Sequence, residues 1–347
     1  MSSLIPIPDA IPVNWWWFQV LLLFTFLIHL LLMNFMLGGS LLTLYDLIRK
    51  KNPTEDSQSL PTLVALTINF GVPPLLFVQV LYGHLFYSSS ILMAVPWIMV
   101  IPILILAYYG AHIFSHGLSK SPQLARISLG ISAVLLLVIA FIQVNNNTLM
   151  LTPDKWVTYF DHRGGASLNW REPTLFPRYL HFIIGAIAIA GLGKAAYYKF
   201  KRNMDQSARE SEMKEGLKIF GWVTVVQMGI GTWFWLSLPS DIWRLFMGKN
   251  LAYTALMVAG WLLSLLILHS ALTNRFWLSV INGLLAMAVM VIIRDLVRHA
   301  YLNNIFSPKE LQVTGEISPL IAFLAIFAIG LFSLYYMVRL LVKSKTE

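Results

Sequence analysis

Histidines within long apolar segments are the residues of this chain best suited to chemistry. A charged side chain at the centre of a membrane helix costs on the order of 2.5–3.5 kcal/mol on insertion scales, so such residues are rarely left against lipid. Neutral imidazole is the usual axial ligand of haem iron, and thioether sulfur is another. Four such histidines, His29, His84, His181 and His299, are candidates for cofactor binding, and Met257 is a fifth, although alone it would be taken as a packing residue because the chain has 14 methionines. For each histidine, a hydrogen-bonded packing role is the alternative.

A second set of candidates lies near the end of one apolar segment. Asp295, Arg298 and His299 are spaced i, i+3 and i+4, so a helix presents them on one face. Because charged side chains are costly against lipid, we expect this face to point into the protein. An ion pair between Asp295 and Arg298 along the helix would need no cofactor, and it is the alternative to a catalytic role for the two residues.

The composition places all of these residues in a membrane protein. Of 347 residues, 57% are hydrophobic and only 12% are charged, against about 25% charged residues in ordinary soluble chains. These values exclude soluble enzymes and nucleic-acid binders. The chain has no cysteine, which excludes disulfides, cysteine-ligated iron–sulfur clusters and covalently attached haem. Any haem must therefore be held by side chains such as histidine and methionine.

Nine segments are long and apolar enough to cross a bilayer, since a span needs about 20 apolar residues. A membrane-spanning sheet would require short alternating strands closed into a barrel, which the sequence lacks. We therefore predict an all-α integral membrane protein, a nine-span helical bundle that forms one transmembrane domain over residues 1–347. The expected spans are about 15–48, 60–88, 92–118, 126–148, 174–198, 216–238, 251–271, 275–301 and 316–342.

The distribution of Lys and Arg predicts the orientation. If the N-terminus lies outside, 16 of the 25 Lys and Arg residues fall on the inner side and 9 on the outer side. Because basic residues are enriched in cytoplasmic segments, we expect the N-terminus outside and the C-terminus in the cytoplasm. His29 then lies near the middle of the membrane, and the outer half contains His84, His181, Asp295, Arg298 and His299.

Five segments carry a resemblance to a known family. They read IHLLLMNFMLGGSLLTL from residue 28, INFGVPPLLFVQVLYG from 68, RYLHFIIGAIAIAGLGKAAY from 178, ALMVAG from 255 and VIIRDLVRHAYL from 291. With these segments the chain resembles subunit I of the cytochrome bd quinol oxidases, as a divergent and shortened member. The number of spans and their orientation are also similar to those of the family.

The resemblance implies three iron ligands. It places an axial haem ligand of the family on His29, where the type of haem is open. It gives His181 and Met257 the two ligand positions of a low-spin haem b. The implied cofactor is therefore haem b, in one or more copies, with iron coordinated by these three residues.

Of the other functional positions of the family, this sequence matches some and departs from others. Its acid and arginine align with Asp295 and Arg298, which implies proton handling or a place beside the haem for the acid and a haem-propionate contact for the arginine. His299 stands where the family has a glutamine. The two membrane carboxylates of the family fall on or near Leu75 and Ile103, which are apolar.

Two further departures concern the quinol and the haem ligands. The long quinol-binding loop of the family is reduced here to about a dozen residues, Leu238 to Asn250. The arginine beside the family's ligand methionine is Ala255. His84 lies close to the lost glutamate at Leu75 and is a candidate to replace it as a haem ligand, although a histidine at the membrane interface is the alternative.

The implied function is electron transfer by a haem-b membrane redox subunit, between quinol and haems in the outer half of the membrane. Such a subunit would lie in the prokaryotic cytoplasmic (inner) membrane, in contact with lipid. It would pair with a second membrane subunit and pass electrons to a partner such as a periplasmic c-type cytochrome. A true quinol–oxygen oxidoreductase is one alternative, although the lost carboxylates argue against it.

A protein without a cofactor is the remaining alternative, either a transporter or a membrane anchor subunit. Pro73 and Pro74 favour the transporter, because proline breaks or bends a membrane helix and broken helices are typical of transporters. An anchor would leave the histidines and Asp295 within the spans unexplained.

Overall fold

Helices make up nearly all of this computed structural model, which describes residues 4–49, 59–118, 120–160, 164 and 166–344. The only pairing of extended backbone among these residues is an isolated bridge between Ile11 and Val313. The longer helices are α1 (Trp15–Ile48), α2 (Leu60–Met93), α3 (Val95–Gly117), α4 (Pro122–Leu151), α5 (Leu175–Phe200), α6 (Gln206–Leu236), α8 (Leu251–Leu272), α9 (Phe276–Leu302) and α10 (Ser318–Ser344). Short helical turns connect them: η3 (Pro153–Phe160), α7 (Ser240–Trp243), η4 (Arg244–Phe246) and η5 (Pro308–Glu310).

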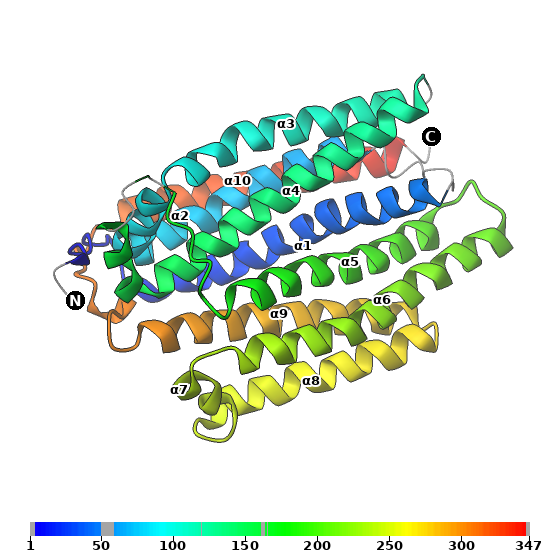
Figure 1. The fold of residues 1–347 in the computed structure, drawn as a ribbon. Coiled ribbons are helices and arrows are strands. Elements are labelled where there is room, and N and C mark those ends of the chain that lie inside the picture. The colour runs from blue at the N-terminus through cyan, green and yellow to red at the C-terminus, as the bar shows by residue number, and fades with distance from the viewer. Residues whose placement is uncertain (1–3, 50–58, 119, 161–163, 165, 345–347) are drawn as a thin grey trace.

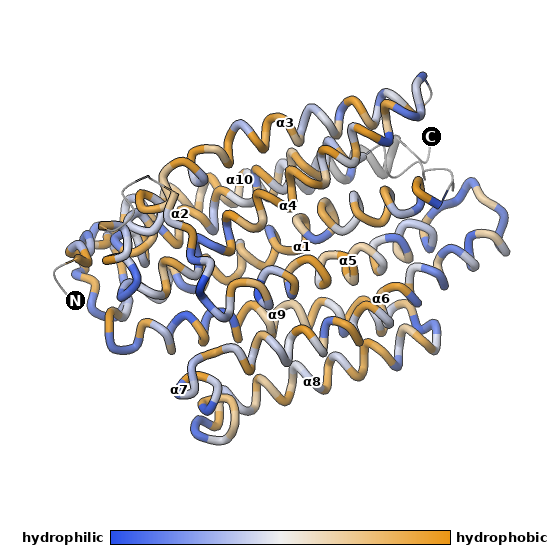
Figure 2. Tube along the Cα trace, viewed as in Figure 1, coloured by the Kyte–Doolittle hydropathy of each residue, from blue (hydrophilic) through white to orange (hydrophobic). Residues whose placement is uncertain are grey.

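Eight of these helices, α1 to α6, α8 and α9, are long and apolar enough to cross a membrane within the described residues. The predicted all-α, multi-pass architecture is therefore confirmed. Helix α10 coincides with the ninth expected span, and its stretch Ser318–Ser333 is apolar. Figure 2 shows hydrophobic residues along the middle of the helices and hydrophilic residues gathered at their ends and in the connections, as expected for a chain surrounded by lipid.

The helices lie side by side and alternate in direction between two ends of the bundle (Figure 1). Helix α1 packs between α2 and α5, and α3 packs against α4. Beyond α5, the helices α6, α8 and α9 complete the other side of the bundle. We call the end at which α1 begins the Trp15 end. Helices α5 and α8 also begin at this end, and α6 and α9 finish there.

Small residues hold α1, α5 and α6 in close contact. A Cβ atom added to Gly38 of α1 would collide with the backbone of Ala186 in α5. One added to Gly216 of α6 would lie 2.6 Å from the backbone nitrogen of Ala195 in α5. Close approach of backbones through small residues is typical of membrane helices. These contacts fix the relative heights of three helices that also line the candidate site.

Helix α2 departs from regular geometry at a different place from the one that its prolines suggest. Pro73 and Pro74 both lie within the helix. The non-helical dihedral angles occur at Tyr82, with φ −134° and ψ 24°, where the chain kinks. Tyr82 is buried beside α9, so the kink belongs to the cluster around Asp295 described below.

Candidate functional site: a cavity between five helices

A cavity of about 240 Å³ lies between α1, α5, α6, α8 and α9. A cavity needs only about 10–15 Å³ to hold one buried water, so this space is far larger than a packing defect. Its walls are mostly apolar and include Phe26, Phe182, Phe220, Trp235 and Val291. Two of the sequence-predicted ligands, His181 and Met257, also line it, so the structure brings together residues that are 76 positions apart.

His181 enters the cavity from α5, with its ring between Phe234 and Gly231 of α6. The centres of the His181 and Phe234 rings are 6.1 Å apart. A Cβ atom on Gly231 would lie 3.2 Å from Cε1 of His181, so the glycine leaves room for the imidazole. The buried Nδ1 atom has no hydrogen-bond partner among the described residues. The ring lines the cavity, and no hydrogen bond to a described residue occupies this nitrogen.

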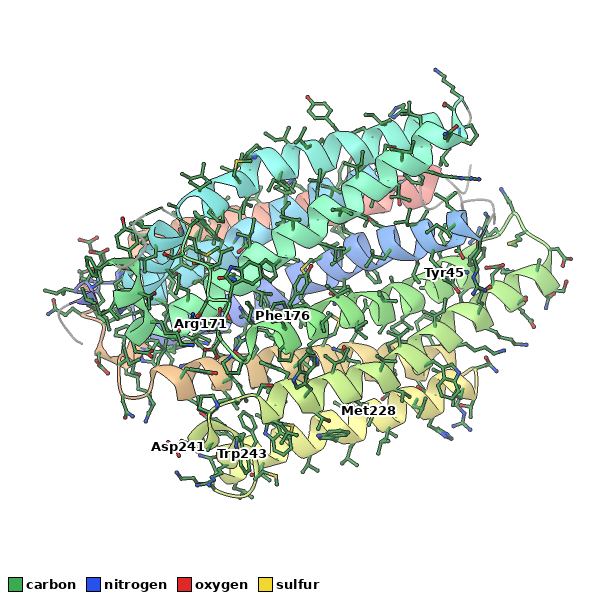
Figure 3. The ribbon with its side chains drawn as sticks, viewed as in Figure 1. Tyr45, Arg171, Phe176, Met228, Asp241 and Trp243 are labelled. Carbon is green, nitrogen blue, oxygen red and sulfur yellow. The ribbon has the colours of Figure 1, made fainter. Side chains whose placement is uncertain are left out.

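Met257 lines the cavity from α8, which packs against α6 and α9. Three further methionines line the same space, Met228, Met287 and Met290, and sequence reasoning did not single them out. Figure 3 labels Met228 on α6, where this helix runs beside α8. Thioether sulfur is therefore available from three helices, and the identity of a methionine ligand has to be tested one residue at a time.

Two arginines line the cavity near the Trp15 end, and sequence reasoning assigned no role to either of them. Arg178 is only 5% exposed, and its Nη1 donates a 2.7 Å hydrogen bond to Oδ1 of Asn147. Its Nε and Nη2 atoms are buried without a hydrogen-bond partner. The guanidinium carbon of Arg294 lies 4.4 Å from the centre of the Phe26 ring. Because guanidinium groups bind carboxylates strongly, this end of the cavity suits an anionic group.

The position of Arg178 in the sequence could have marked it as a residue of the site. Arg178 precedes His181 by three residues, so a helix places the two on one face. Neither Arg178 nor Arg294 forms an ion pair within 4.0 Å in the part of the chain that the structure describes. An anionic ligand would supply the missing counter-charge.

The face of α9 that carries Asp295 points into the bundle, as predicted. Asp295 is 6% exposed and Arg298 is 3% exposed. Nη1 of Arg298 lies 3.4 Å from Oδ1 of Asp295, and Nδ1 of His299 lies 3.3 Å from Oδ2 of Asp295. Gln19 of α1 donates a 2.8 Å hydrogen bond to Oδ2 of Asp295. The hydroxyl of Tyr82, at the kink of α2, lies 3.5 Å from Nε2 of His299.

This cluster is adjacent to the cavity but does not line it. Asp295, Arg298 and His299 are absent from the cavity wall, whereas Arg294 and Val297 of the same helix belong to it. The guanidinium carbon of Arg298 lies 5.0 Å from the centre of the Tyr82 ring, on the side of α9 that faces α2. The structure therefore offers Arg178 and Arg294, rather than Arg298, to an anion in the cavity.

His29 lies between α1 and α2, apart from the cavity wall. Its Nδ1 is 3.1 Å from the backbone oxygen of Thr67. A Cβ atom on Gly71 would lie 2.8 Å from Cε1 of His29, so the glycine makes room for the ring. In metal sites, the second nitrogen of a ligating histidine is usually fixed by such an acceptor, and a packed histidine uses the same bond. The geometry is compatible with either role.

His84 lies in a third place, near the Trp15 end of α2. The centres of the His84 and Phe306 rings are 4.3 Å apart in an edge-to-face arrangement. Its Nε2 atom is buried and has no hydrogen-bond partner among the described residues. The five predicted ligands thus lie in four places. His181 and Met257 line the cavity, His29 lies at the α1–α2 interface, His84 lies against Phe306, and His299 belongs to the cluster around Asp295.

Comparison with known proteins does not assign the chain to a family. No protein-family model matches the chain. No curated protein matches it either. The resemblance to the cytochrome bd subunits therefore rests on the five segments quoted above, and the cavity is described independently of them.

Proposed function

We propose that this chain is a haem-b membrane redox subunit that transfers electrons from quinol to a partner protein. One observation carries the proposal: His181 and Met257, which come from different helices, line one mostly apolar cavity together with two arginines that form no ion pair with a described residue. Imidazole and thioether are both ligands of haem iron in proteins. A bound haem b would supply reversible uptake of a single electron.

Small residues make room for the side chains of the site. Gly185, Ala188, Gly231 and Gly260 all line the cavity. Gln227 lies against Gly185, His181 against Gly231 and Met290 against Gly260. The apolar walls exclude water, which strengthens the interaction of charged groups inside.

The side chains of this site would do three things. His181 and Met257 would hold the iron of the haem. Arg178 and Arg294 would bind the two propionates of the haem and neutralise them. Their positive charge also favours the reduced state of any redox group nearby, because reduction adds a negative charge.

The finer topology belongs to the same proposal. With α10 as the ninth span, the N-terminus lies outside and the C-terminus lies in the cytoplasm, so that the Trp15 end faces outward. The site would then lie in the outer half of a prokaryotic inner membrane. From there it could reach a periplasmic c-type cytochrome, with a second membrane subunit alongside.

Oxygen reduction is not part of this proposal. The two carboxylates of the cytochrome bd family are replaced by Leu75 and an apolar residue near Ile103, so proton supply to a bound oxygen would lack both groups. Leu75 is 37% exposed on α2, away from the cavity wall. An electron-transfer role with an external acceptor needs neither carboxylate.

An optical spectrum of the purified protein tests the proposal. Dithionite reduction should produce an α-band, and His181→Ala should remove one such band. His112→Ala is the matched control on α3, outside the cavity wall, and should leave the spectrum unchanged. Met257→Leu should convert the haem from low to high spin, whereas Met228→Leu should not. A wild-type protein without Soret absorption would overturn the proposal and leave a transporter or an anchor.

A further inference from the structure

We infer that the cavity also contains the site for the quinol headgroup, about one helical turn from His181 toward the Ile48 end of α1. This inference rests on the proposed function for the use of quinol. The connection Leu238–Asn250 is too short to replace the quinol-binding loop of the cytochrome bd subunits, so the quinol site has to be sought elsewhere. The argument starts from two amide side chains in the cavity wall, Asn34 and Gln227.

Asn34 is a buried amide without a partner. It lies on α1 with 5% of its surface exposed and lines the cavity. No hydrogen bond joins its side chain to another residue of the described part of the chain. The amide of Asn34 is therefore available to donate to, or accept from, a polar group in the cavity.

Gln227 supplies a second group from α6. Its Nε2 donates a 2.9 Å hydrogen bond to the backbone oxygen of His181, which fixes the orientation of the amide. Its Oε1 is buried and has no hydrogen-bond partner among the described residues. An acceptor atom is therefore held in place within the wall of the cavity, one helix away from Asn34.

Asn34 and Gln227 lie at similar heights in the bundle. Gly38, one turn after Asn34, contacts Ala186 of α5. Gln227 contacts α5 at His181 and at Gly185, where an added Cβ atom would lie 3.2 Å from Nε2 of Gln227. Both amides are therefore level with the turn of α5 that follows His181.

Ser264 of α8 adds a third polar group at this height. Gly221 of α6 meets Ala271 of α8, where an added Cβ atom would lie 3.1 Å from the alanine Cβ. From that contact, Gln227 and Ser264 are about 9 and 10 Å toward the Trp15 end, at 1.5 Å per residue. The Ser264 hydroxyl donates to the backbone oxygen of Gly260, so its oxygen remains able to accept.

These groups match a lipid-soluble ring with two opposite oxygens. Asn34 can donate to one oxygen of a quinone, and Oε1 of Gln227 can accept from a hydroxyl of a quinol. Toward the Ile48 end the wall becomes apolar, with Phe220, Ile267 and Met287. Such a surface suits the ring substituents and the isoprenoid chain.

Access from the lipid is also available. Trp261 of α8 lines the cavity and is 37% exposed, so the wall is thin at this point. In a membrane protein such a side chain faces the hydrocarbon region, where quinones dissolve. A quinol could therefore enter sideways between helices without crossing the Leu238–Asn250 connection.

Titration of decylubiquinone or menadione into the purified protein tests the inference, with the reduced spectrum recorded on the same samples. Asn34→Leu and Gln227→Leu should each weaken quinone binding at least about tenfold, the equivalent of one lost hydrogen bond. Asn69→Leu and Gln143→Leu change exposed amides on α2 and α4 and should bind as the wild type does. Retained haem bands with lost quinone binding would support the site.

A photoreactive azidoquinone gives a second measurement that does not depend on the folding of a variant. It should label peptides from α1, α6 or α8 in the wild-type protein. Labelling confined to residues 238–250, absence of binding by either quinone, or wild-type affinity in both cavity variants would overturn the inference. A protein that binds quinone at these helices but contains no haem would overturn the proposed function and leave the quinone site in place.

Discussion

Gln19 of α1 donates a 2.8 Å hydrogen bond to Asp295 of α9, although 276 residues separate them in the chain. The bond links the first and the eighth expected spans at the Trp15 end of the bundle. It also satisfies one oxygen of a carboxylate that is 6% exposed. Since α1 and α9 both line the cavity, this bond helps to hold two of its walls together.

Loss of the Gln19 amide should therefore destabilise the protein. Gln19→Leu leaves one oxygen of Asp295 without this donor, which we expect to cost about 1–3 kcal/mol. Unfolding in an SDS titration, followed by circular dichroism, measures the change. Gln143→Leu replaces an exposed glutamine of α4 and should leave the midpoint unchanged. Equal midpoints for Gln19→Leu and the wild type would show that the bond contributes no stability.

The arginines of the cavity should control the potential of a bound haem more strongly than Arg298 does. Arg294→Leu removes a positive charge from the cavity wall and should lower a haem midpoint potential by tens of millivolts, where about 59 mV corresponds to a tenfold change for one electron. Arg298→Leu removes a charge that is paired with Asp295, so its effect should be smaller. Potentiometric titration of both variants decides the order. A larger shift for Arg298→Leu would restore that residue to the propionate contact.

A close helix contact should limit substitution at Gly216. An added Cβ atom would lie 2.6 Å from the backbone of Ala195, so Gly216→Ala must push α6 away from α5. We expect a loss of about 1–3 kcal/mol, typical of overpacking. Gly130→Ala is the control, because nothing lies within 4 Å of its added Cβ atom. Thermal unfolding should separate the two variants, and equal melting temperatures would contradict the close contact.

The helical class and most spans could be predicted because a membrane span imposes a long apolar run. His181 and Met257 were expected at similar depth, and both line one cavity; their pairing as ligands stays a prediction. Arg178 was missed because a basic residue at the start of a span is normally taken as interfacial. Asn34 and Gln227 were missed for another reason: uncharged amides cost little on insertion, so nothing in the sequence marks which of them face a cavity.

The kink in α2 shows a further limit of sequence reasoning. The sequence places a break at Pro73 and Pro74, whereas the non-helical dihedral angles occur at Tyr82. Tyr82 packs beneath the Arg298 guanidinium and beside His299, which are more than 200 residues away in the chain. A tertiary contact of this kind leaves no local signal.

Quinol-dependent oxygen consumption should be slow or absent in the purified protein. Where the resemblance to the cytochrome bd subunits would place the two proton-delivering carboxylates, this chain has Leu75 and an apolar residue near Ile103. Oxygen uptake with decylubiquinol, measured with an electrode, checks this expectation. Reduction of an added c-type cytochrome under the same conditions is the positive control for electron transfer. Rapid oxygen uptake would instead favour the quinol–oxygen oxidoreductase.

Gly231 should be required for the imidazole of His181 to reach the cavity. A Cβ atom at this position would lie 3.2 Å from Cε1 and 3.5 Å from Nδ1 of His181, so Gly231→Leu must displace the ring. We expect the reduced α-band to be lost, as in His181→Ala. Gly229→Leu changes the same helix two residues away, at an exposed position with nothing within 4 Å, and should keep the band. If Gly231→Leu also kept it, His181 would not be the ligand in this cavity.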